Sequence, residues 1–263
     1  MSKENNYNKI RETHQIENAR QRKLRRRKIS YIILLLVVIF AFFFLCYRYL
    51  FLVVEVQYNG NERYTAEELS KAFGVGEGDR LFSYSKSKKE EALLGAFPYL
   101  EKCEIKRKVP DKIIVTVSER TEIMFTYVSG KYIIFDKDMY VVEISQTKPQ
   151  NLLEVNFENT MLLKCVLGEP ILFEDEKSGV GLYRLYEALS SAPMFEKTKY
   201  LTVKSRFDFY IQYEDSFEIY MGDSSECSAK LLFAHEIMRK LPVQSKGKID
   251  VSNPSEGYFK DMQ

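Results

Sequence analysis

The segment at residues 29–47 most constrains what this chain can fold into, because none of its 19 residues is charged. A helix of that length spans about 28 Å, close to the hydrocarbon thickness of a bilayer. A helix buried in a soluble core is disfavoured because no face of the segment is polar. A cleaved signal peptide is disfavoured by the 28-residue leader and by the lack of a small-x-small cleavage site. We therefore predict an uncleaved transmembrane signal anchor over residues 29–52.

Charge is distributed unevenly around this anchor. Residues 1–28 hold ten basic and three acidic side chains, whereas the residues from Arg48 onward hold 29 basic and 34 acidic ones. The positive-inside rule predicts that residues 1–28 form a basic cytoplasmic tail and that the chain beyond about residue 52 lies outside the membrane. Topology and attraction to anionic lipid explain the basic run at 20–28. We expect no nucleic-acid partner, because the run has no interleaved aromatic residues and no binding motif.

Residues 53–121 predict a first small domain with the element order strand, helix, helix, strand, strand. The helices follow apparent capping boxes, Thr65 with Glu68 and Ser87 with Glu90. The strands are expected at 53–58, 100–109 and 112–119. Its predicted core consists of Leu69, Phe73, Phe97, Ile105, Ile113 and Val115.

Residues 122–251 predict a second domain, mainly an antiparallel sheet with flanking helices, so that the fold class is α+β. A β-meander is expected at 127–144, and strands with period-two alternation are expected at 201–204, 207–214 and 217–221. Helices are expected at 179–190 and 224–241. The last strand is predicted at 247–251, and residues 252–263 are predicted as a C-terminal tail.

Several stretches resemble the membrane-proximal POTRA domain of the FtsQ/DivIB cell-division proteins. They are Val-Glu-Val-Gln-Tyr-Asn-Gly-Asn at 54–61, Phe-Pro-Tyr at 97–99 and the stretch at 107–120, which ends in Glu-Arg. Residues 130–136 and 249–253 resemble the β-domain that follows in that family. Two departures stand out: Thr121 and Glu122 replace a frequent Pro after the Glu-Arg pair, and Lys137-Asp138-Met139 replaces a turn that often contains Gly.

The resemblance implies one transmembrane helix, a POTRA domain of β-α-α-β-β order and a β-domain. It also implies a non-catalytic scaffold at the division septum. Such a scaffold binds small bitopic coiled-coil partners of the FtsB/DivIC and FtsL type and links the division ring to septal wall synthesis.

A search for catalytic chemistry finds little in this sequence. The only histidines are His14 and His235, and metal-binding spacings such as HExxH and CxxC are absent. We therefore predict no catalytic residues, no cofactor and no metal site. The alternative is a membrane-anchored cell-surface enzyme acting on wall polymer, whose carboxylate pair would lie among the 34 acidic residues after Tyr47.

Three cysteines lie beyond the anchor: Cys103, Cys165 and Cys227. Their odd number permits one disulfide and one thiol in an oxidising exterior. Cys103 occupies an expected inward strand position and Cys227 the apolar side of its helix. We favour three buried thiols.

The end of the chain provides the predicted partner-binding residues: Gly247, Ile249 and Val251 of the last strand, with Tyr258 and Phe259 after it. A strand at a sheet edge offers unpaired N–H and C=O groups to a partner segment, and aromatic side chains are enriched in binding hot spots. The alternative is that Tyr258 packs on its own sheet or that the tail is frayed. Resemblance to FtsQ/DivIB proteins, whose last strands receive the FtsB-type partner, favours binding.

The predicted topology has a direct test. Protease added to intact spheroplasts should remove the region at 53–263 and leave the basic tail protected, because only the tail is predicted to lie in the cytoplasm. Digestion of the tail with protection of the C-terminal region would reverse the orientation.

Overall fold

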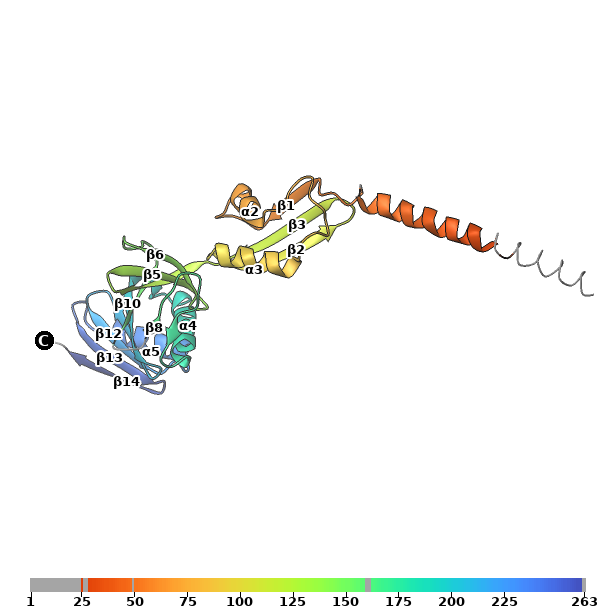
Figure 1. The fold of residues 1–263 in the computed structure, drawn as a ribbon. Coiled ribbons are helices and arrows are strands. Elements are labelled where there is room, and N and C mark those ends of the chain that lie inside the picture. The colour runs from red at the N-terminus through yellow and green to blue at the C-terminus, as the bar shows by residue number, and fades with distance from the viewer. Residues whose placement is uncertain (1–24, 26–27, 49, 159–161, 262–263) are drawn as a thin grey trace, which may run out of the picture. The chain divides into compact units, whose positions relative to one another are not determined.

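A computed structural model of the protein describes residues 25, 28–48, 50–158 and 162–261 (Figure 1). The chain forms two compact units whose segments alternate along the sequence. The first contains the segments up to 57, 74–85 and 105–115, and the second contains 58–73, 86–104 and the segments from 116 onward. The predicted boundaries near residues 52, 121 and 251 are a different division of the chain and stay predictions.

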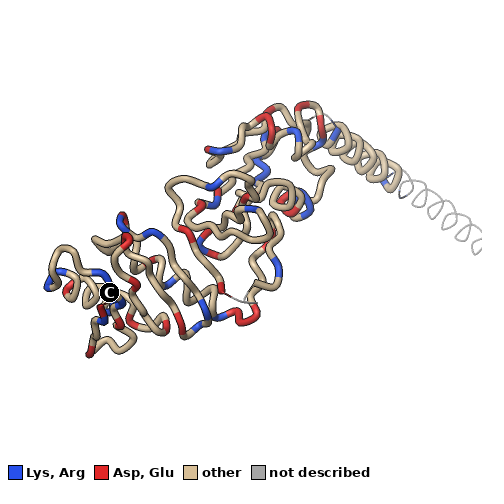
Figure 2. The backbone as a smooth tube through the Cα atoms, turned by 90° about the vertical axis from the view of Figure 1, so that its left-hand side faces the viewer, with Lys and Arg blue, Asp and Glu red and all other residues tan. Residues whose placement is uncertain are grey.

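A 21-residue helix, Lys28–Arg48, covers residues 29–48 of the predicted anchor at 29–52, whose last residues, 50–52, are not helical. Its mean hydropathy is 3.1, and none of its most apolar stretch is buried inside the protein. Figure 2 shows no Lys, Arg, Asp or Glu between its two ends. The helix is therefore long and apolar enough to cross a bilayer. The predicted basic tail lies almost entirely outside the described residues.

Three strands form a small sheet, as predicted, and their order in space is β1-β3-β2. They are β1 (Glu55–Asn59), β2 (Leu100–Lys108) and β3 (Lys112–Glu119). Of the predicted core, Ile105, Ile113 and Val115 are buried in β2 and β3. Their alternation with exposed neighbours is the period-two pattern of a sheet with one wet face.

Two helices, α2 (Ala66–Phe73) and α3 (Lys86–Ala96), separate β1 from β2 in sequence. The capping box of α2 is confirmed: the amide of Thr65 donates to Glu68 Oε2 (2.9 Å) and the amide of Glu68 donates to Thr65 Oγ1 (3.2 Å). Gly74 ends α2 in the left-handed conformation that glycine adopts most readily (φ 59°). The second predicted box is wrong, because α3 begins at Lys86 and Ser87 lies inside it.

Of the core residues predicted in the helical region, two are buried and one is not. Leu69 and Phe73 of α2 are fully buried, and Leu93 of α3 is buried with them, although it was not predicted. Phe97 is only half-buried, which corrects the prediction. It follows the last residue of α3 and packs on the ring of Tyr64, with 4.6 Å between ring centroids.

Nine strands form the large sheet, in the order β14-β13-β12-β11-β10-β7-β4-β5-β6. In the described chain five of its eight strand pairs are antiparallel, so the sheet is mainly antiparallel as predicted. The strands are β4 (Glu122–Val128), β5 (Lys131–Asp136), β6 (Val141–Ser145), β7 (Leu153–Phe157), β10 (Thr198–Ser205), β11 (Asp208–Tyr213), β12 (Phe217–Gly222), β13 (Gly247–Asn253) and β14 (Glu256–Asp261).

Two helices, α4 (Lys177–Ser190) and α5 (Cys227–Lys240), contribute to one large apolar core with the sheet (Figure 1). The core includes Leu182 and Leu185 of α4, Leu231 and Ala234 of α5, and inward residues from most of the strands. A 3₁₀ turn, η2 (Phe195–Lys197), leads into β10. A separate small sheet pairs β8 (Leu162–Lys164) with β9 (Leu172–Phe173).

The C-terminal end differs from the sequence-based expectation. Residues 256–261, predicted as tail, form the strand β14 and pair antiparallel with β13. The large sheet therefore does not end at 247–251, and β13 is its second strand from the edge. The strands β7, β8 and β9 were also not predicted, because they are short and lie among irregular segments.

The burial of Leu69 makes a stability test available. Leu69→Ala should lower the free energy of unfolding by about 2–5 kcal/mol, since it removes a fully buried side chain and leaves a cavity. Urea unfolding measures this change. Leu163→Ala is the matched control, because Leu163 is 59% exposed and its truncation should cost no more than about 0.5 kcal/mol. Equal effects of the two variants would contradict the assignment of Leu69 to the core.

Candidate functional site

The strand β14 forms one free edge of the nine-stranded sheet. The amide of Gly247 donates to the carbonyl of Ser216 (2.8 Å), so this residue of β13 directs its backbone groups toward β12. Because backbone groups alternate along a strand, Lys248 and Asp250 direct theirs toward β14, opposite Lys260 and Tyr258. The N–H and C=O groups of Phe259 and Asp261 consequently point away from β13, toward the open edge.

The two faces of β14 have different surroundings. On the core side, Gly257 lies against α5: a Cβ at this position would approach Ile237 to 2.6 Å and Phe233 to 2.7 Å. Only glycine therefore allows this strand to approach the helix so closely. Phe259 points to the same side, and its ring lies 6.3 Å from that of Phe217.

On the opposite face, the side chain of Tyr258 projects from the sheet and is 64% exposed. Its hydroxyl donates to Glu256 Oε2 (2.9 Å), which holds the ring over its own strand. The remaining side chains of β14, apart from Gly257 and Phe259, are charged and exposed. Charged side chains on an edge strand reduce unspecific edge-to-edge pairing and leave the main-chain groups available to a matched segment.

The sequence-predicted partner residues separate into two groups. Tyr258 and Phe259 lie on the edge strand, Tyr258 outward and Phe259 partly against the core. Gly247, Ile249 and Val251 do not lie at the edge, since β14 covers β13 and all three are buried. The premise that the last strand at 247–251 is the terminal strand is therefore wrong.

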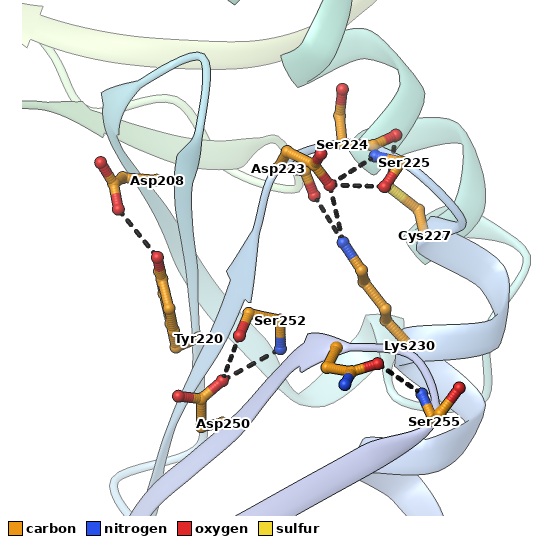
Figure 3. A network of polar contacts seen from close by, with 11 residues as sticks. Asp208, Tyr220, Asp223, Ser224, Ser225, Cys227, Lys230, Asp250, Ser252 and Ser255 are labelled. Atoms are coloured by element: carbon orange, nitrogen blue, oxygen red, sulfur yellow. Dashed lines mark hydrogen bonds and ion pairs between the residues drawn. The ribbon is translucent and has the colours of Figure 1, made fainter.

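A network of polar contacts involves β12, α5 and the turn between β13 and β14 (Figure 3). Lys230 of α5 is fully buried, and its Nζ donates to the carbonyl oxygen (3.1 Å) and to Oδ1 (2.8 Å) of Asp223. Ser225 also donates to Asp223 Oδ1, from its amide and its hydroxyl. These hydrogen bonds, first that of Lys230, lower the pKa of Asp223 to about 2. The pair fixes the connection between β12 and α5.

A second part of the network shapes the turn into β14. Asp250 Oδ1 accepts hydrogen bonds from the amide (3.0 Å) and hydroxyl (2.7 Å) of Ser252. Asn253 Oδ1 accepts one from the amide of Ser255 (3.0 Å). Such side-chain to backbone bonds stabilise tight turns, so the direction of β14 is set locally by polar residues at 250–255.

Aromatic and basic side chains adjoin the edge on the outward face. The rings of Tyr210 and Tyr220 lie 4.8 Å apart, and Lys248 Nζ lies 4.8 and 5.5 Å from their centroids. Burial, followed by the hydrogen bond that the Tyr220 hydroxyl donates to Asp208 (2.9 Å), raises the pKa of Tyr220 to about 12. Tyr220 therefore stays a neutral hydrogen-bond donor at physiological pH.

Lys230, Asp223 and Gly257 were not singled out from the sequence. Lysine on a predicted amphipathic helix is usually solvated. One feature of the sequence did indicate that Lys230 is buried: it lies between Cys227 and Ala234, on the apolar face of α5.

The cysteines and His235 do not lie on the open edge, although Cys227 adjoins the Asp223 network, where its thiol donates to the carbonyl of Ser224 (3.4 Å, Figure 3). Cys46, Cys103, Cys165 and Cys227 are free thiols. Cys227 is buried as predicted, whereas Cys103 and Cys165 are only partly buried, which corrects the prediction of three buried thiols. Burial raises the pKa of Cys103 to about 11. His235 lies partly buried on α5. The described residues contain no group of three or more His, Cys, Asp or Glu side chains able to hold a metal ion.

Comparison with known proteins gives consistent matches. Residues 51–120 match the model of the FtsQ-type POTRA domain. The chain is 22% identical over 216 residues to the cell division protein DivIB of Clostridium tetani, covering 82% of this chain and 78% of that protein. It is 23% identical over 218 residues to DivIB of Clostridium botulinum strain Hall, covering 82% and 84%.

A solved structure also matches: the major extracytoplasmic domain of the trans isomer of DivIB from Geobacillus stearothermophilus. The match has a TM-score of 0.29 and 14% identity, and it covers 48% of this chain and 99% of the solved chain.

An apolar N-terminal helix, an FtsQ-type POTRA domain and a large mainly antiparallel sheet define a membrane-anchored division protein of the POTRA class. The chain is similar to the FtsQ/DivIB cell-division proteins, through its FtsQ-type POTRA domain at 51–120 and through the DivIB relatives that it matches over 82% of its length. Its role is accordingly in cell division.

The Asp223–Lys230 pair predicts a pH dependence of stability. The lowered folded-state pKa means that the carboxylate stabilises the fold above its ordinary value near 3.8, and that this contribution is lost as the pH falls toward about 2. Asp223→Asn lacks this titration. Unfolding by urea should show the wild type as the more stable protein at pH 7 and the difference shrinking between about pH 4 and pH 2. A difference that stays constant across that range would contradict the ion pair.

Proposed function

We propose that this protein is a non-catalytic division scaffold at the septum, with its N-terminus in the cytoplasm and its folded units outside the membrane. In this proposal it binds small bitopic partners of the FtsB/DivIC and FtsL type and links the division ring to septal wall synthesis. The similarity of the chain to these division proteins supports the scaffold role. The uneven charge around the membrane helix supports the orientation.

The observation that carries the partner-binding part is the open edge of β14. Its outward amides and carbonyls at Phe259 and Asp261 match what an added strand requires. Strand addition obtains affinity from main-chain hydrogen bonds and specificity from alternate side chains. On β14 those alternate side chains are exposed Tyr258 on one face and partly buried Phe259 on the other.

The edge is also preorganised, which favours binding because less conformational entropy is lost. Gly257 seats β14 against α5, and the Asp250–Ser252 and Asn253–Ser255 bonds fix the turn before it. The buried residues Gly247, Ile249 and Val251 would then contribute by supporting β14 rather than by touching the partner. The proposed contact residues are thus Tyr258, Phe259 and the backbone of Asp261.

The side-chain part of the proposal is tested with Tyr258→Ala. Binding of the full-length protein, in nanodiscs, to the extracytoplasmic segments of FtsB/DivIC-type partners should weaken by more than 1 kcal/mol, roughly fivefold in Kd, as expected of a hot-spot aromatic. Tyr127→Ala is the matched control, because Tyr127 is a similarly exposed tyrosine (56%) on β4 of the same sheet. Its removal should leave the Kd unchanged.

The main-chain part is tested by Asp261→Pro beside Asp261→Ala. Both variants remove the same carboxylate, but only proline removes the outward N–H. Strand addition predicts that the proline variant binds the partner more weakly than the alanine variant. Equal binding of both, together with an unaffected Tyr258→Ala variant, would move the partner site away from this edge.

A further inference from the structure

A cluster of aromatic and arginine side chains follows the membrane helix directly. The ring of Phe51 lies 6.5 Å from that of Tyr47, near the end of the helix, and 5.5 Å from that of Phe82, in the loop between α2 and α3. The guanidinium of Arg107 lies 5.4 Å from the Phe82 ring and 4.5 Å from the Tyr84 ring. All these residues belong to the first compact unit.

Backbone contacts tie the loop to the chain that leaves the membrane. The amide of Leu81 donates to the carbonyl of Phe51 (3.0 Å), and the amide of Val53 donates to the carbonyl of Asp79 (2.8 Å). Leu52 and Arg80 form an antiparallel bridge. The loop at 79–84 is therefore held beside residues 51–53, whatever the arrangement of the rest of the chain.

Chain connectivity sets the distance of this cluster from the bilayer. The amide of Leu50 donates to the carbonyl of Cys46 (2.8 Å), so Leu50 lies one helical turn beyond a residue of the apolar segment. Phe51 is the next residue and lies within about 10 Å of Cys46. The headgroup region is about 5–7 Å deep beyond the hydrocarbon on each side. With the membrane helix ending at Arg48 rather than at residue 52, Phe51 and its neighbour Phe82 are expected close to the headgroup layer.

The side chains exposed here suit that environment better than water. Phe82 is 45% exposed although it contacts Phe51 and Arg107, and Leu50 and Val54 are 55% and 58% exposed. Aromatic rings with arginine beside them are the usual composition of a membrane interface, where rings meet acyl chains and guanidinium groups reach phosphates. Two nearby acidic side chains have partners within the unit: Glu55 pairs with Lys112 (2.7 Å), and Asp79 Oδ2 accepts from the amide of Gly76 (2.9 Å).

We propose that the loop at 79–84, with Phe51 and Arg107, is a second membrane-contact site that inserts Phe82 into the headgroup–acyl boundary of the leaflet where the helix ends. Its partner is the phospholipid surface itself. This contact restrains the domain at the membrane surface, which the single helix alone does not do. The proposal rests on the membrane helix and is independent of the partner-binding edge.

The test uses the absence of tryptophan from this chain. Phe82→Trp introduces a single fluorophore into the full-length protein, reconstituted in phosphatidylcholine vesicles with acyl chains brominated near the headgroup. The matched control is Phe207→Trp, because Phe207 in the second unit is also an exposed phenylalanine (56%) with an arginine, Arg206, 4.5 Å from its ring. Membrane insertion predicts blue-shifted emission and strong quenching at position 82 and neither at position 207. Water-like, unquenched emission at position 82 would overturn the proposal.

A measurement on the unmodified protein covers the case in which Phe82→Trp fails to fold. Wild-type protein is reconstituted with lipids that carry a photoreactive group near the headgroup, irradiated and mapped by peptide mass spectrometry. Adducts within residues 79–84 support the contact. Adducts confined to the membrane helix would overturn it.

Discussion

The buried carboxylate of Asp136 stabilises the connection between the small sheet and the large sheet. Asp136 is 2% exposed and accepts hydrogen bonds from Arg120 Nη1 (2.6 Å) and from the amides of Asp138 and Tyr140 (2.9 Å each). Arg120 is the first residue after β3, and its guanidinium lies 3.8 Å from the centre of the Tyr140 ring. The two partners stabilise each other, since loss of the Asp136 carboxylate would leave a largely buried guanidinium with only the more distant and more exposed carboxylate of Asp138 (3.5 Å) as counter-ion.

A second cluster reinforces the same region. Arg63 stacks on the ring of Tyr99 (3.6 Å) and pairs with Glu122 (3.1 Å). The hydroxyl of Tyr99 donates to Glu143 (2.9 Å), and the ring of Tyr99 packs with Phe125 in a small core on β4 and β5. The two segments that carry Arg63 and Tyr99 are thereby joined to the large sheet. This agrees with the division of the chain, in which both segments and the large sheet belong to the second compact unit. Strand β4 cannot shift without breaking these contacts, so they restrain its position in the sheet.

The sequence predicted this fold well wherever periodicity was strong. The strands at 112–119 and 217–222 and the helix at 227–240 repeat apolar residues at the spacing of their class, and burial follows the pattern. Prediction failed where contacts with other elements determine the secondary structure of a segment. Strand β14 contains a glycine and four polar or charged residues in six, and it becomes a strand because β13 and α5 supply its partners. Tyr258 and Phe259, which the sequence singles out, lie on the terminal strand, and their binding role stays a prediction. Which strand is terminal depends on pairing that no local pattern encodes.

The membrane-contact cluster and the partner-binding edge lie in different compact units and share no residue. Effects of substitutions at two such sites add when the sites have no common partner. In the two proposals Phe82 acts through lipid and Tyr258 through a protein segment, so lipid composition and partner concentration should affect one site each. The chain passes between the two units in β1, β2 and β3 and also on either side of the loop at 74–85. Of these segments, β3 leads directly to Arg120 and its pairing with Asp136. Asp136 itself belongs to the second unit, so its buried carboxylate stabilises the unit that contains the proposed partner-binding edge.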